Sequence, residues 1–472
     1  GWPDSPSTHA AAVVIADGPL TDYVPLQVVV PKGGQGSQKA RTSVITQWGM
    51  GDVENAGLLK MDFLGLRNLT ILDRSLEIIE RVRGKDACPD LYQLPMEDTE
   101  TFALLQRGET KGVFQLESGG IRDLLQKLKP DSFRDIIAVN ALYRPGPLRG
   151  GMVESYVNRK HGRETPTYIH EVLETVLSET YGVMVYQEQV MRLLNRLGGI
   201  ELTEAYSCIK AISKKKQGLI DSFKEQFVQG SQDRGLGAKQ ATEIFELITH
   251  FGGYGFNKSH STAYALIAYQ TAYLKAHFPV EFMAALLSSD ISSRQFNQKD
   301  RLVEHLEDCR RVGVEVLSPD VNQGEKEFAV IEGNRIAFAL TAIKGIGAPV
   351  AQEIISARTK EGPFSDLYDF CERVDQKLVT GTVIENLIKS GGFDSLPGTR
   401  AQKCWVLQKA LQSGGQLQSD RRRGQRNFLA ELDSEAEERE IIPLPEVPDW
   451  PENEKLRFEK ELLGFYSTSH PL

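Results

Sequence analysis

Helical periodicity over a long middle region is the feature that most limits how this chain can fold. From about residue 98 to residue 293, apolar residues such as Leu124 and Leu128 recur at a spacing of about 3.6 residues. Within this region, a strongly apolar stretch at residues 263–269 predicts a fully buried helix. Residues 8–30 instead alternate between apolar and polar types and are rich in β-branched residues, which predicts strands. We therefore expect an α+β fold that is mostly α-helical.

The length of the chain predicts several domains. Its 472 residues exceed the size at which a single hydrophobic core stops growing. The sequence divides into a strand-rich start, a long helical region, a compact unit and an extended polar C-terminal arm. We place these four parts at residues 1–68, 69–318, 319–396 and 397–472. The sequence begins with Gly1 rather than with methionine, from which we expect a fragment of a longer protein.

Charge and composition exclude several classes of protein. The net charge of −9 repels phosphate, so contact with nucleic acid must come from local basic clusters. Five cysteines without a CxxC pair indicate reduced thiols in a cytoplasmic protein, rather than a disulfide framework or a zinc site. No apolar run approaches the length of a membrane helix, so we expect no membrane association.

The segment at residues 60–66 places a carboxylate between apolar neighbours. On a strand, alternation puts Lys60 and Asp62 on one face, and Met61 and Phe63 on the other. An ionised aspartate on a half-buried strand needs a cation, a metal ion or hydrogen bonds to offset its desolvation. Asp62 is therefore a candidate metal ligand. A salt-bridged or capping aspartate is the alternative.

Two basic segments are candidates for phosphate binding. Pro145 and Pro147 stiffen the backbone beside Arg144, and a rigid guanidinium suits two-pronged contact with a phosphate. Arg159 and Lys160 follow shortly afterwards. A solvated turn with an ordinary surface arginine is the alternative.

Two further segments suit contact with a nucleotide. Tyr186 and Gln187 can stack on a base or read its edge, and an amphipathic helix start is the alternative. Lys210 and Lys214 share a helical face at i, i+4, where like charges repel unless an anion bridges them. A solvated lysine run that includes Lys215 is the alternative there.

The glycine-rich segment at residues 252–261 also carries donors. Its glycines permit close approach of the backbone, and Lys258 and His260 can both donate to phosphate. A glycine-rich hinge is the alternative.

Residues 343–347 predict a helix-hairpin-helix. The spacing of Gly345 and Gly347 between apolar residues is typical of this motif, with an apolar helix expected on each side. Its glycines expose backbone N–H groups to a DNA phosphate, so Lys344 and both glycines are candidates for sequence-independent DNA contact. Residues 388–393 resemble a poorer second copy. A tight turn between helices is the alternative.

The polar C-terminal arm contains a short apolar group. Gln425, Phe428 and Leu429 lie in a polar, charge-rich segment, where large apolar side chains are unfavourable unless a partner pocket receives them. A short helix that packs on its own domain is the alternative.

These segments occur together and in the same order in one family. The chain closely resembles the α subunits of bacterial DNA polymerase III, the replicative C-family polymerases, over essentially its whole length. The segments that carry the resemblance are residues 9–11, 60–66, 113–118, 144–147, 181–191, 210–216 and 253–264. The resemblance implies that residues 1–68 are the end of the palm, 69–318 the fingers, 319–396 the helix-hairpin-helix unit, and 397–472 the linker and clamp-binding region.

The resemblance implies two-metal transfer of a nucleotide from a deoxynucleoside triphosphate to a primer 3′-hydroxyl in chromosomal replication. Asp62 matches the third of three palm aspartates that hold two Mg²⁺ ions, and Lys60 would contact the primer or the triphosphate. The other two aspartates lie upstream in the family, so we expect the isolated chain to be inactive. The implied contacts to the triphosphate and the nascent base pair are Arg144, Tyr186, Gln187, Lys210, Lys214, Lys215, Lys258 and His260.

The resemblance also implies partners and a location. These are primer–template DNA, deoxynucleotides, a sliding clamp, a clamp loader and a proofreading subunit, in the cytoplasm at the nucleoid. The candidate contacts to DNA are Arg159, Lys160, Lys344, Gly345 and Gly347. The candidate contacts to the clamp are Gln425, Phe428 and Leu429, and His9 belongs to a palm motif.

Two departures from the family pattern weaken individual contacts. Ile209 stands where the family often has an arginine, which removes one phosphate contact or shifts its load to Lys214 and Lys215. Phe428 precedes Leu429, whereas the clamp-binding pentapeptide of the family usually ends with phenylalanine. The rival function is a non-catalytic DNA-binding and sliding-clamp adapter protein.

Overall fold

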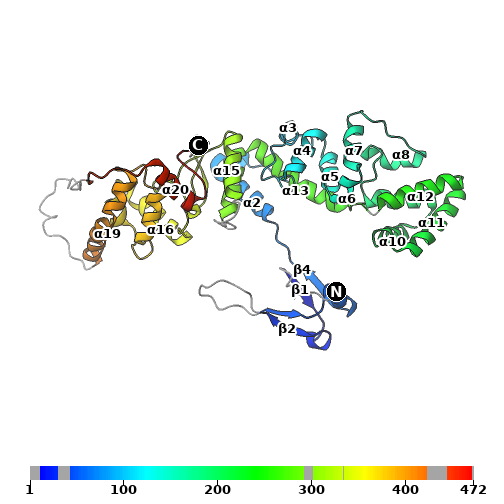
Figure 1. Ribbon diagram of the computed structural model, residues 1–472, viewed down its shortest axis with the longest axis horizontal. Coiled ribbons are helices and arrows are strands. Elements are labelled where there is room, and N and C mark those ends of the chain that lie inside the picture. Colours follow the sequence, from blue (N-terminus) through cyan, green and yellow to red (C-terminus); the bar gives the residue numbers. More distant parts are fainter. Residues whose placement is uncertain are drawn as a thin grey trace. The chain divides into compact units, whose positions relative to one another are not determined.

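The computed structural model describes residues 11–29, 43–252, 254–291, 301–332, 334–422 and 444–469. The chain divides into two units, Gly1–Arg67 and Asn68–Leu472, each of which is described by itself (Figure 1). Helices dominate and the sheets are small, so the prediction of a mostly helical α+β fold is confirmed. None of the helices in these ranges is long and apolar enough to cross a membrane.

The N-terminal unit consists of two antiparallel strand pairs around a small core of Val24, Val53 and Leu58. The first pair is β1 with β4, and the second is β2 with β3. The predicted strands at residues 8–30 are confirmed where this part of the chain is described. The elements are β1 (Ala12–Ile15), η1 (Leu20–Asp22), β2 (Leu26–Val29), β3 (Ser43–Thr46), α1 (Met50–Asn55) and β4 (Leu59–Asp62).

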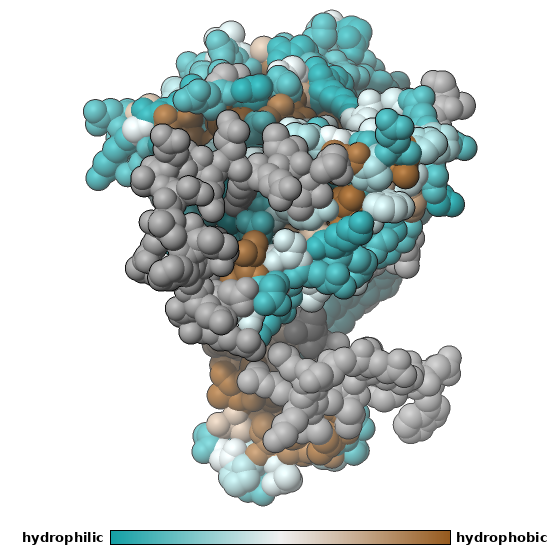
Figure 2. Space-filling view, turned by 90° about the vertical axis from the view of Figure 1, so that its left-hand side faces the viewer, coloured by the Kyte–Doolittle hydropathy of each residue, from teal (hydrophilic) through white to brown (hydrophobic). Residues whose placement is uncertain are grey.

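One face of the β1–β4 pair is apolar and exposed. Val13 lies opposite Met61, and Ile15 lies opposite Leu59. Each of these four side chains is between 41% and 56% exposed. Figure 2 shows apolar residues gathered on the surface of the N-terminal unit. The expectation of a half-buried strand at Asp62 is therefore wrong in this unit, because the apolar face of β4 meets solvent.

The middle region is a succession of helices, as the periodicity predicted. The helix expected from residue 68 or 70 to about residue 82 is α2 (Arg67–Arg83). The elements that follow are η2 (Lys85–Ala87), α3 (Thr99–Arg107), α4 (Gly119–Leu128), α5 (Phe133–Leu142), α6 (Pro145–Arg149), α7 (Met152–Lys160), α8 (Glu171–Leu177), η3 (Ser178–Thr180), α9 (Gln187–Gly198), α10 (Leu202–Ser213), α11 (Gln217–Gln232), α12 (Ala238–Gly252), α13 (Lys258–His277), α14 (Pro279–Ile291) and α15 (Arg301–Arg311).

The first half of the apolar helix α13 is buried along one side only. Ala265, Ala268 and Tyr269 are buried where α13 packs on α3 and α5. Ala263 is exposed, and Ile267 is partly exposed. The expectation that residues 263–269 are fully buried is therefore wrong, because the other side of α13 lacks a covering layer among the described elements.

A three-stranded sheet and five helices complete the second unit. In the sheet, β5 is parallel to the central strand β7, and β6 is antiparallel to it. The elements are β5 (Glu315–Val316), β6 (Ala329–Ile331), β7 (Arg335–Ala337), η4 (Leu340–Ala342), α16 (Ala348–Glu361), α17 (Leu367–Arg373), α18 (Gly381–Lys389), α19 (Arg400–Arg422) and α20 (Glu452–Leu463).

Two of the hydrophobic cores among the described residues of the second unit bear on the candidate sites. One lies among α8 to α12 and includes Leu193, Phe227 and Phe245. The other begins at Ile71 in α2, continues through α14 and the three-stranded sheet, and reaches Leu463 in α20. This second core crosses residue 318 without a break, so the predicted fingers and helix-hairpin-helix parts share one packed interior.

A helix occupies residues at which a linker was expected. α19 packs on α17 although its second half is polar. Its Gln418 donates to the carbonyl oxygens of Cys371, Glu372 and Val374, which lie at the end of α17. Polar side chains of α19 thus satisfy carbonyl groups that the end of α17 leaves without helical partners.

Candidate nucleotide and DNA-binding site

Asp62 and Lys60 lie on the same face of β4, as alternation predicted. Asp62 pairs with Ala12 and Lys60 with Val14 in the antiparallel register. The Lys60 ammonium contacts the Asp62 carboxylate at 2.6 Å, and the two side chains are 13% and 40% exposed. This ion pair offsets the desolvation of the aspartate, so the salt-bridge alternative describes its state in this structure.

The described residues do not by themselves fit a two-ion magnesium site. No group of three or more histidine, cysteine, aspartate or glutamate side chains within them is arranged to hold a metal ion. Mg²⁺ takes octahedral oxygen coordination and gives up its water reluctantly, so one carboxylate cannot organise two ions. Asp62 can supply one ligand.

Two segments that are distant in the sequence meet beside the start of α13. Tyr186 and Phe256 form a parallel β-bridge, in which Gln187 N–H donates to the Phe256 carbonyl at 2.9 Å. Phe256 N–H in turn donates to the Val185 carbonyl at 3.0 Å. A side chain at Gly255 would press against Gln187, so the glycine allows this close approach. The bridge brings Tyr186 and Gln187 to the segment that carries Lys258 and His260.

Arg144 joins the same group from the start of α6. It is the N-cap residue before Pro145 and has the extended backbone that a following proline favours. Its guanidinium donates to the carbonyls of Ala141 and Tyr254, both at 2.7 Å, and lies 4.4 Å from the centre of the Phe256 ring. Burial lowers the pKa of Arg144, but an arginine remains charged at neutral pH. Two of its five N–H groups are used in these bonds.

Lys258 and His260 occupy the first turn of α13. The Lys258 ammonium contacts both oxygens of Glu179, at 2.9 and 2.7 Å, and lies 5.2 Å from the centre of the Tyr186 ring. His260 packs between the rings of Phe256 and Tyr264. We call Arg144, Tyr186, Gln187, Lys258 and His260 the α13 cluster.

A cavity of about 530 Å³ opens beside the α13 cluster. Its lining includes Lys258, Glu179, Glu188 and Arg192. Sequence reasoning missed the last three. Glu188 and Arg192 are spaced i, i+4 on the face of α9, a pattern that could have signalled a charged wall. The two cations of the cavity, Lys258 and Arg192, suit a phosphorylated ligand.

Lys210 in α10, and Lys214 and Lys215 just after its end, lie outside the cavity lining. Lys210 stacks on Tyr206, at 4.5 Å from the ring centre, and Lys215 has a left-handed backbone at the end of the helix. Ile209 is 1% exposed and packs in the core of α8 to α12. Position 209 therefore faces the core. A side chain at this position does not point to a ligand outside the helix, so the presence of Ile209 costs no phosphate contact in this structure.

Arg159 and Lys160 are engaged within the chain. Arg159 contacts Glu164 at 2.7 Å and donates to the Tyr181 carbonyl. The Lys160 side chain is 6% exposed and pairs with Asp131 and Asp135. A buried, doubly paired lysine is not accessible to a DNA phosphate in this structure.

Lys344, Gly345 and Gly347 form an exposed turn. Gly345 has a φ of +87°, which side chains rarely adopt, and Ile343 and Ile346 are buried beneath it. Gly347 is the N-cap residue of α16. The element before the turn is the three-residue η4, so the expectation of an apolar helix on that side is wrong. The turn nevertheless presents the backbone of a helix N-terminus to solvent.

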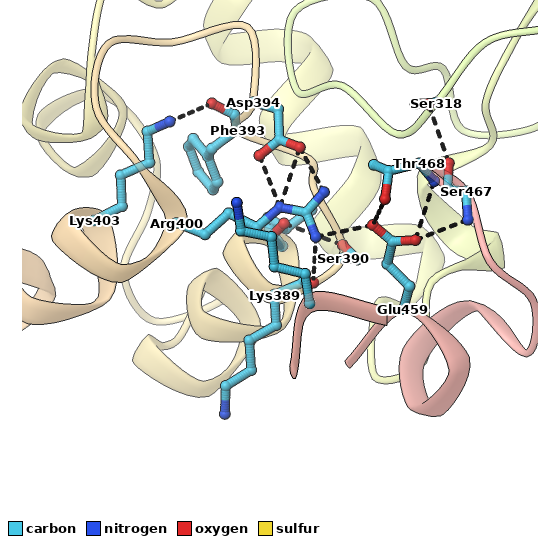
Figure 3. A network of polar contacts seen from close by, with 12 residues as sticks. Ser318, Lys389, Ser390, Phe393, Asp394, Arg400, Lys403, Glu459, Ser467 and Thr468 are labelled. Atoms are coloured by element: carbon cyan, nitrogen blue, oxygen red, sulfur yellow. Dashed lines mark hydrogen bonds and ion pairs between the residues drawn. The ribbon is translucent and has the colours of Figure 1, made fainter. Parts of the chain in front are cut away.

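At residues 388–393, the poorer second copy of the hairpin, the Arg400 side chain of the same chain occupies the turn. Arg400 donates to the Lys389 carbonyl at 3.3 Å and to Asp394 at 2.9 Å, and it also contacts Glu459 in α20 at 3.0 Å (Figure 3). Gly391, with a φ of +90°, lies against the Arg400 guanidinium. This turn thus anchors α20 to the helix-hairpin-helix unit.

Several candidate residues lie outside the described part of the chain. These are His9, Gln425, Phe428 and Leu429.

Comparisons with known proteins match consecutive parts of the chain. Residues 1–65 match the bacterial DNA polymerase III alpha NTPase domain, residues 68–235 the bacterial DNA polymerase III alpha subunit finger domain, and residues 313–403 a helix-hairpin-helix motif. These matches define the class as a multidomain chain built from domains of the bacterial DNA polymerase III α type.

Relatives from distant bacteria match over almost all of the chain. The DNA polymerase III subunit alpha of Escherichia coli K12 is 42% identical over 471 residues, which cover 98% of this chain and 39% of that protein. Those of Thermus aquaticus and Halalkalibacterium halodurans are each 43% identical, over 99% and 100% of this chain and over 36% and 40% of the relatives. The chain therefore belongs to the family of bacterial DNA polymerase III α subunits, and it spans about two-fifths of the length of these relatives.

Proposed function

We propose that this chain acts in the catalytic subunit of a DNA-directed DNA polymerase in chromosomal replication, binding deoxynucleoside triphosphates and primer–template DNA. The observation that carries the proposal is the α13 cluster, in which two cations, a tyrosine and a histidine from three separate segments meet, and whose Lys258 lines the cavity. The family supports the same reaction.

Within this proposal, Lys258 and Arg144 contact the triphosphate and His260 lies against the nascent base pair. Tyr186 is 3% exposed, so its ring supports Lys258 from within the chain and the expectation that it stacks on a base is not favoured. Burial raises the pKa of Tyr186, so its hydroxyl stays protonated and can donate a hydrogen bond. Gln187 reads a base edge. Lys210, Lys214 and Lys215 form a separate basic surface at the end of α10 that suits a DNA backbone or a triphosphate.

Asp62 is proposed as one carboxylate ligand of the magnesium ions of the polymerase. Such ions supply charge stabilisation at the reacting phosphate when bound. In the ion-free state Lys60 neutralises the carboxylate, and it remains a candidate for contact with the primer or the triphosphate.

The helix-hairpin-helix unit is proposed to bind duplex DNA without regard to sequence, through Lys344 and the backbone at Gly345 and Gly347. A sliding clamp is proposed to bind at Gln425, Phe428 and Leu429. A clamp loader and a proofreading subunit are further proposed partners, in the cytoplasm at the nucleoid.

The catalytic proposal is tested by primer extension with a full-length α subunit that contains these 472 residues. We expect Asp62→Asn to abolish extension and to leave DNA binding, measured by fluorescence anisotropy, largely intact. The substitution keeps the size of the side chain but removes the charge that a metal ion requires. Normal extension by Asp62→Asn would refute the role of Asp62.

The nucleotide site is tested in the same assay with Lys258→Met. We expect the KM for deoxynucleotides to rise at least about tenfold, because a hydrogen bond to a charged group contributes ~1.5–3 kcal/mol. The matched control is Lys224→Met, which removes a lysine from the exposed pair with Glu246. An unchanged KM for Lys258→Met, or an equal rise in the control, would exclude Lys258 from the site.

A non-catalytic DNA-binding and clamp-adapter function is the second candidate. The exposed turn at Lys344, together with the matched helix-hairpin-helix model, favours it. It predicts salt-dependent duplex binding that deoxynucleotides do not change. Loss of extension in Asp62→Asn, with extension by the unmutated protein, would rule it out.

A further inference from the structure

Two carboxylates from neighbouring segments hold Lys258. Glu179, in η3, accepts both hydrogen bonds from the ammonium group. Glu188, in the first turn of α9, accepts the backbone N–H of Lys258 at 3.0 and 2.9 Å. The Glu179 and Lys258 side chains are only 28% and 35% exposed, so the pair is partly shielded from solvent. All three residues line the same cavity.

These carboxylates occupy positions that suit a phosphate. The first N–H groups of a long helix carry partial positive charge and bind anions, and α13 has 20 residues. Glu188 binds the first of these N–H groups, and Glu179 neutralises the ammonium beside it. Two hydrogen bonds of the Lys258 ammonium already go to Glu179, so a phosphate oxygen that approaches this ammonium competes with Glu179 for it.

A second cation is available in the cavity when Lys258 changes partner. Arg192 lies one helical turn after Glu188 on α9 and lines the cavity. Its side chain is exposed and forms no ion pair with any residue in the described ranges. Among the described residues, the cavity therefore contains one cation that is already paired, Lys258, and one without an ion-pair partner, Arg192.

We propose that Glu179 is an internal competitor for the anion at Lys258, which rests on the proposed function of the cavity as a triphosphate site. Without a ligand, Glu179 keeps Lys258 paired. When a triphosphate binds, Lys258 and Arg192 contact its oxygens and Glu179 is released. The same exchange runs in reverse when pyrophosphate leaves, so Glu179 lowers the affinity for the substrate and for this product alike.

The test is calorimetric titration of the 472-residue chain with inorganic tripolyphosphate. We expect Glu179→Gln to bind about fivefold more tightly, the effect of removing one partly shielded charged competitor. Glutamine keeps the shape of the side chain and can still accept a hydrogen bond. We expect Lys258→Met to weaken binding, and the double variant Glu179→Gln/Lys258→Met to bind no more tightly than Lys258→Met alone.

The matched control is Glu246→Gln, which also removes one negative charge but from the exposed pair with Lys224 on α11 and α12. We expect no change, because the effect requires contact with Lys258 rather than a general change in net charge. An equal gain in Glu246→Gln would refute the proposal.

The two proposals fail in different ways. If Lys258→Met loses binding and Glu179→Gln binds no more tightly than the unmutated chain, the internal competition is refuted while the triphosphate site stands. If the double variant keeps the full gain of Glu179→Gln, Glu179 does not act through Lys258 and the proposal is again refuted. If neither the unmutated chain nor Glu179→Gln binds tripolyphosphate, the site and the competition fail together.

Discussion

Among single residues, Glu459 is a carboxylate with no exposed surface whose two oxygens accept four hydrogen bonds. They come from Arg400, Ser467 and Thr468 (Figure 3). We expect Glu459→Ala to lower the free energy of unfolding by about 3–5 kcal/mol, because it leaves the buried Arg400 guanidinium short of one partner. Urea denaturation measures this effect.

The control for that variant is Glu454→Ala on the same helix, whose carboxylate pairs with the exposed Arg457 at 3.3 Å. We expect a change within about 0.5 kcal/mol there, as for surface pairs in general. Equal denaturation midpoints for the two variants would contradict the role of Glu459.

Residue types were more predictable than their partners. The side chains of the α13 cluster could be named from the sequence, because phosphate and bases require cations and aromatic rings. The pairing of Lys258 with Glu179 could not, since the two are separated by 79 positions and only the fold brings them together. The sequence also did not show which way a side chain points, as the buried Lys160 and the inward-facing Ile209 illustrate.

At the scale of elements, α19 and α17 approach each other closely at one glycine. A side chain at Gly414 would clash with the backbone carbonyl of Cys371, whereas one at Gly415 would meet the movable end of Gln376. We expect Gly414→Ala to destabilise the chain by about 1–3 kcal/mol, because the two helices must separate. We expect Gly415→Ala to be neutral or stabilising, since alanine favours a helix. Thermal unfolding of both variants compares them, and a stabilised Gly414→Ala would contradict the close contact.

Elements with strong periodicity were predicted well, and those that depend on a neighbour were not. α2 matches its expected range closely, since its apolar spacing is local information. The second half of α19 is polar, so the sequence suggested a linker. That helix is stabilised by hydrogen bonds from Gln418 to the end of α17, which no local pattern reveals. The three-residue η4 was missed for a similar reason.

Within the unit Asn68–Leu472, the two cores described above are separate from each other and predict two regions that unfold independently. Phe338 is 2% exposed and packs on Phe328 and Phe465 in the core that crosses residue 318. We expect Phe338→Ala to lower the hydrogen-exchange protection of α14 and α18 together, and to leave α9 to α12 unchanged. Phe227→Ala should do the opposite, because Phe227 belongs to the other core. Mass spectrometry of deuterium uptake measures both effects. A uniform loss of protection in either variant would contradict the prediction that the two cores unfold independently.

The hairpin at Gly345 is also fastened to the last helix. Lys344 N–H donates to the Leu462 carbonyl at 3.0 Å, and Leu462 is buried in the core beneath the turn. A displacement of α20 therefore reaches the hairpin directly through this hydrogen bond. Under the DNA contact proposed for this turn, a displacement of the hairpin by the duplex would be passed to α20 through the same hydrogen bond.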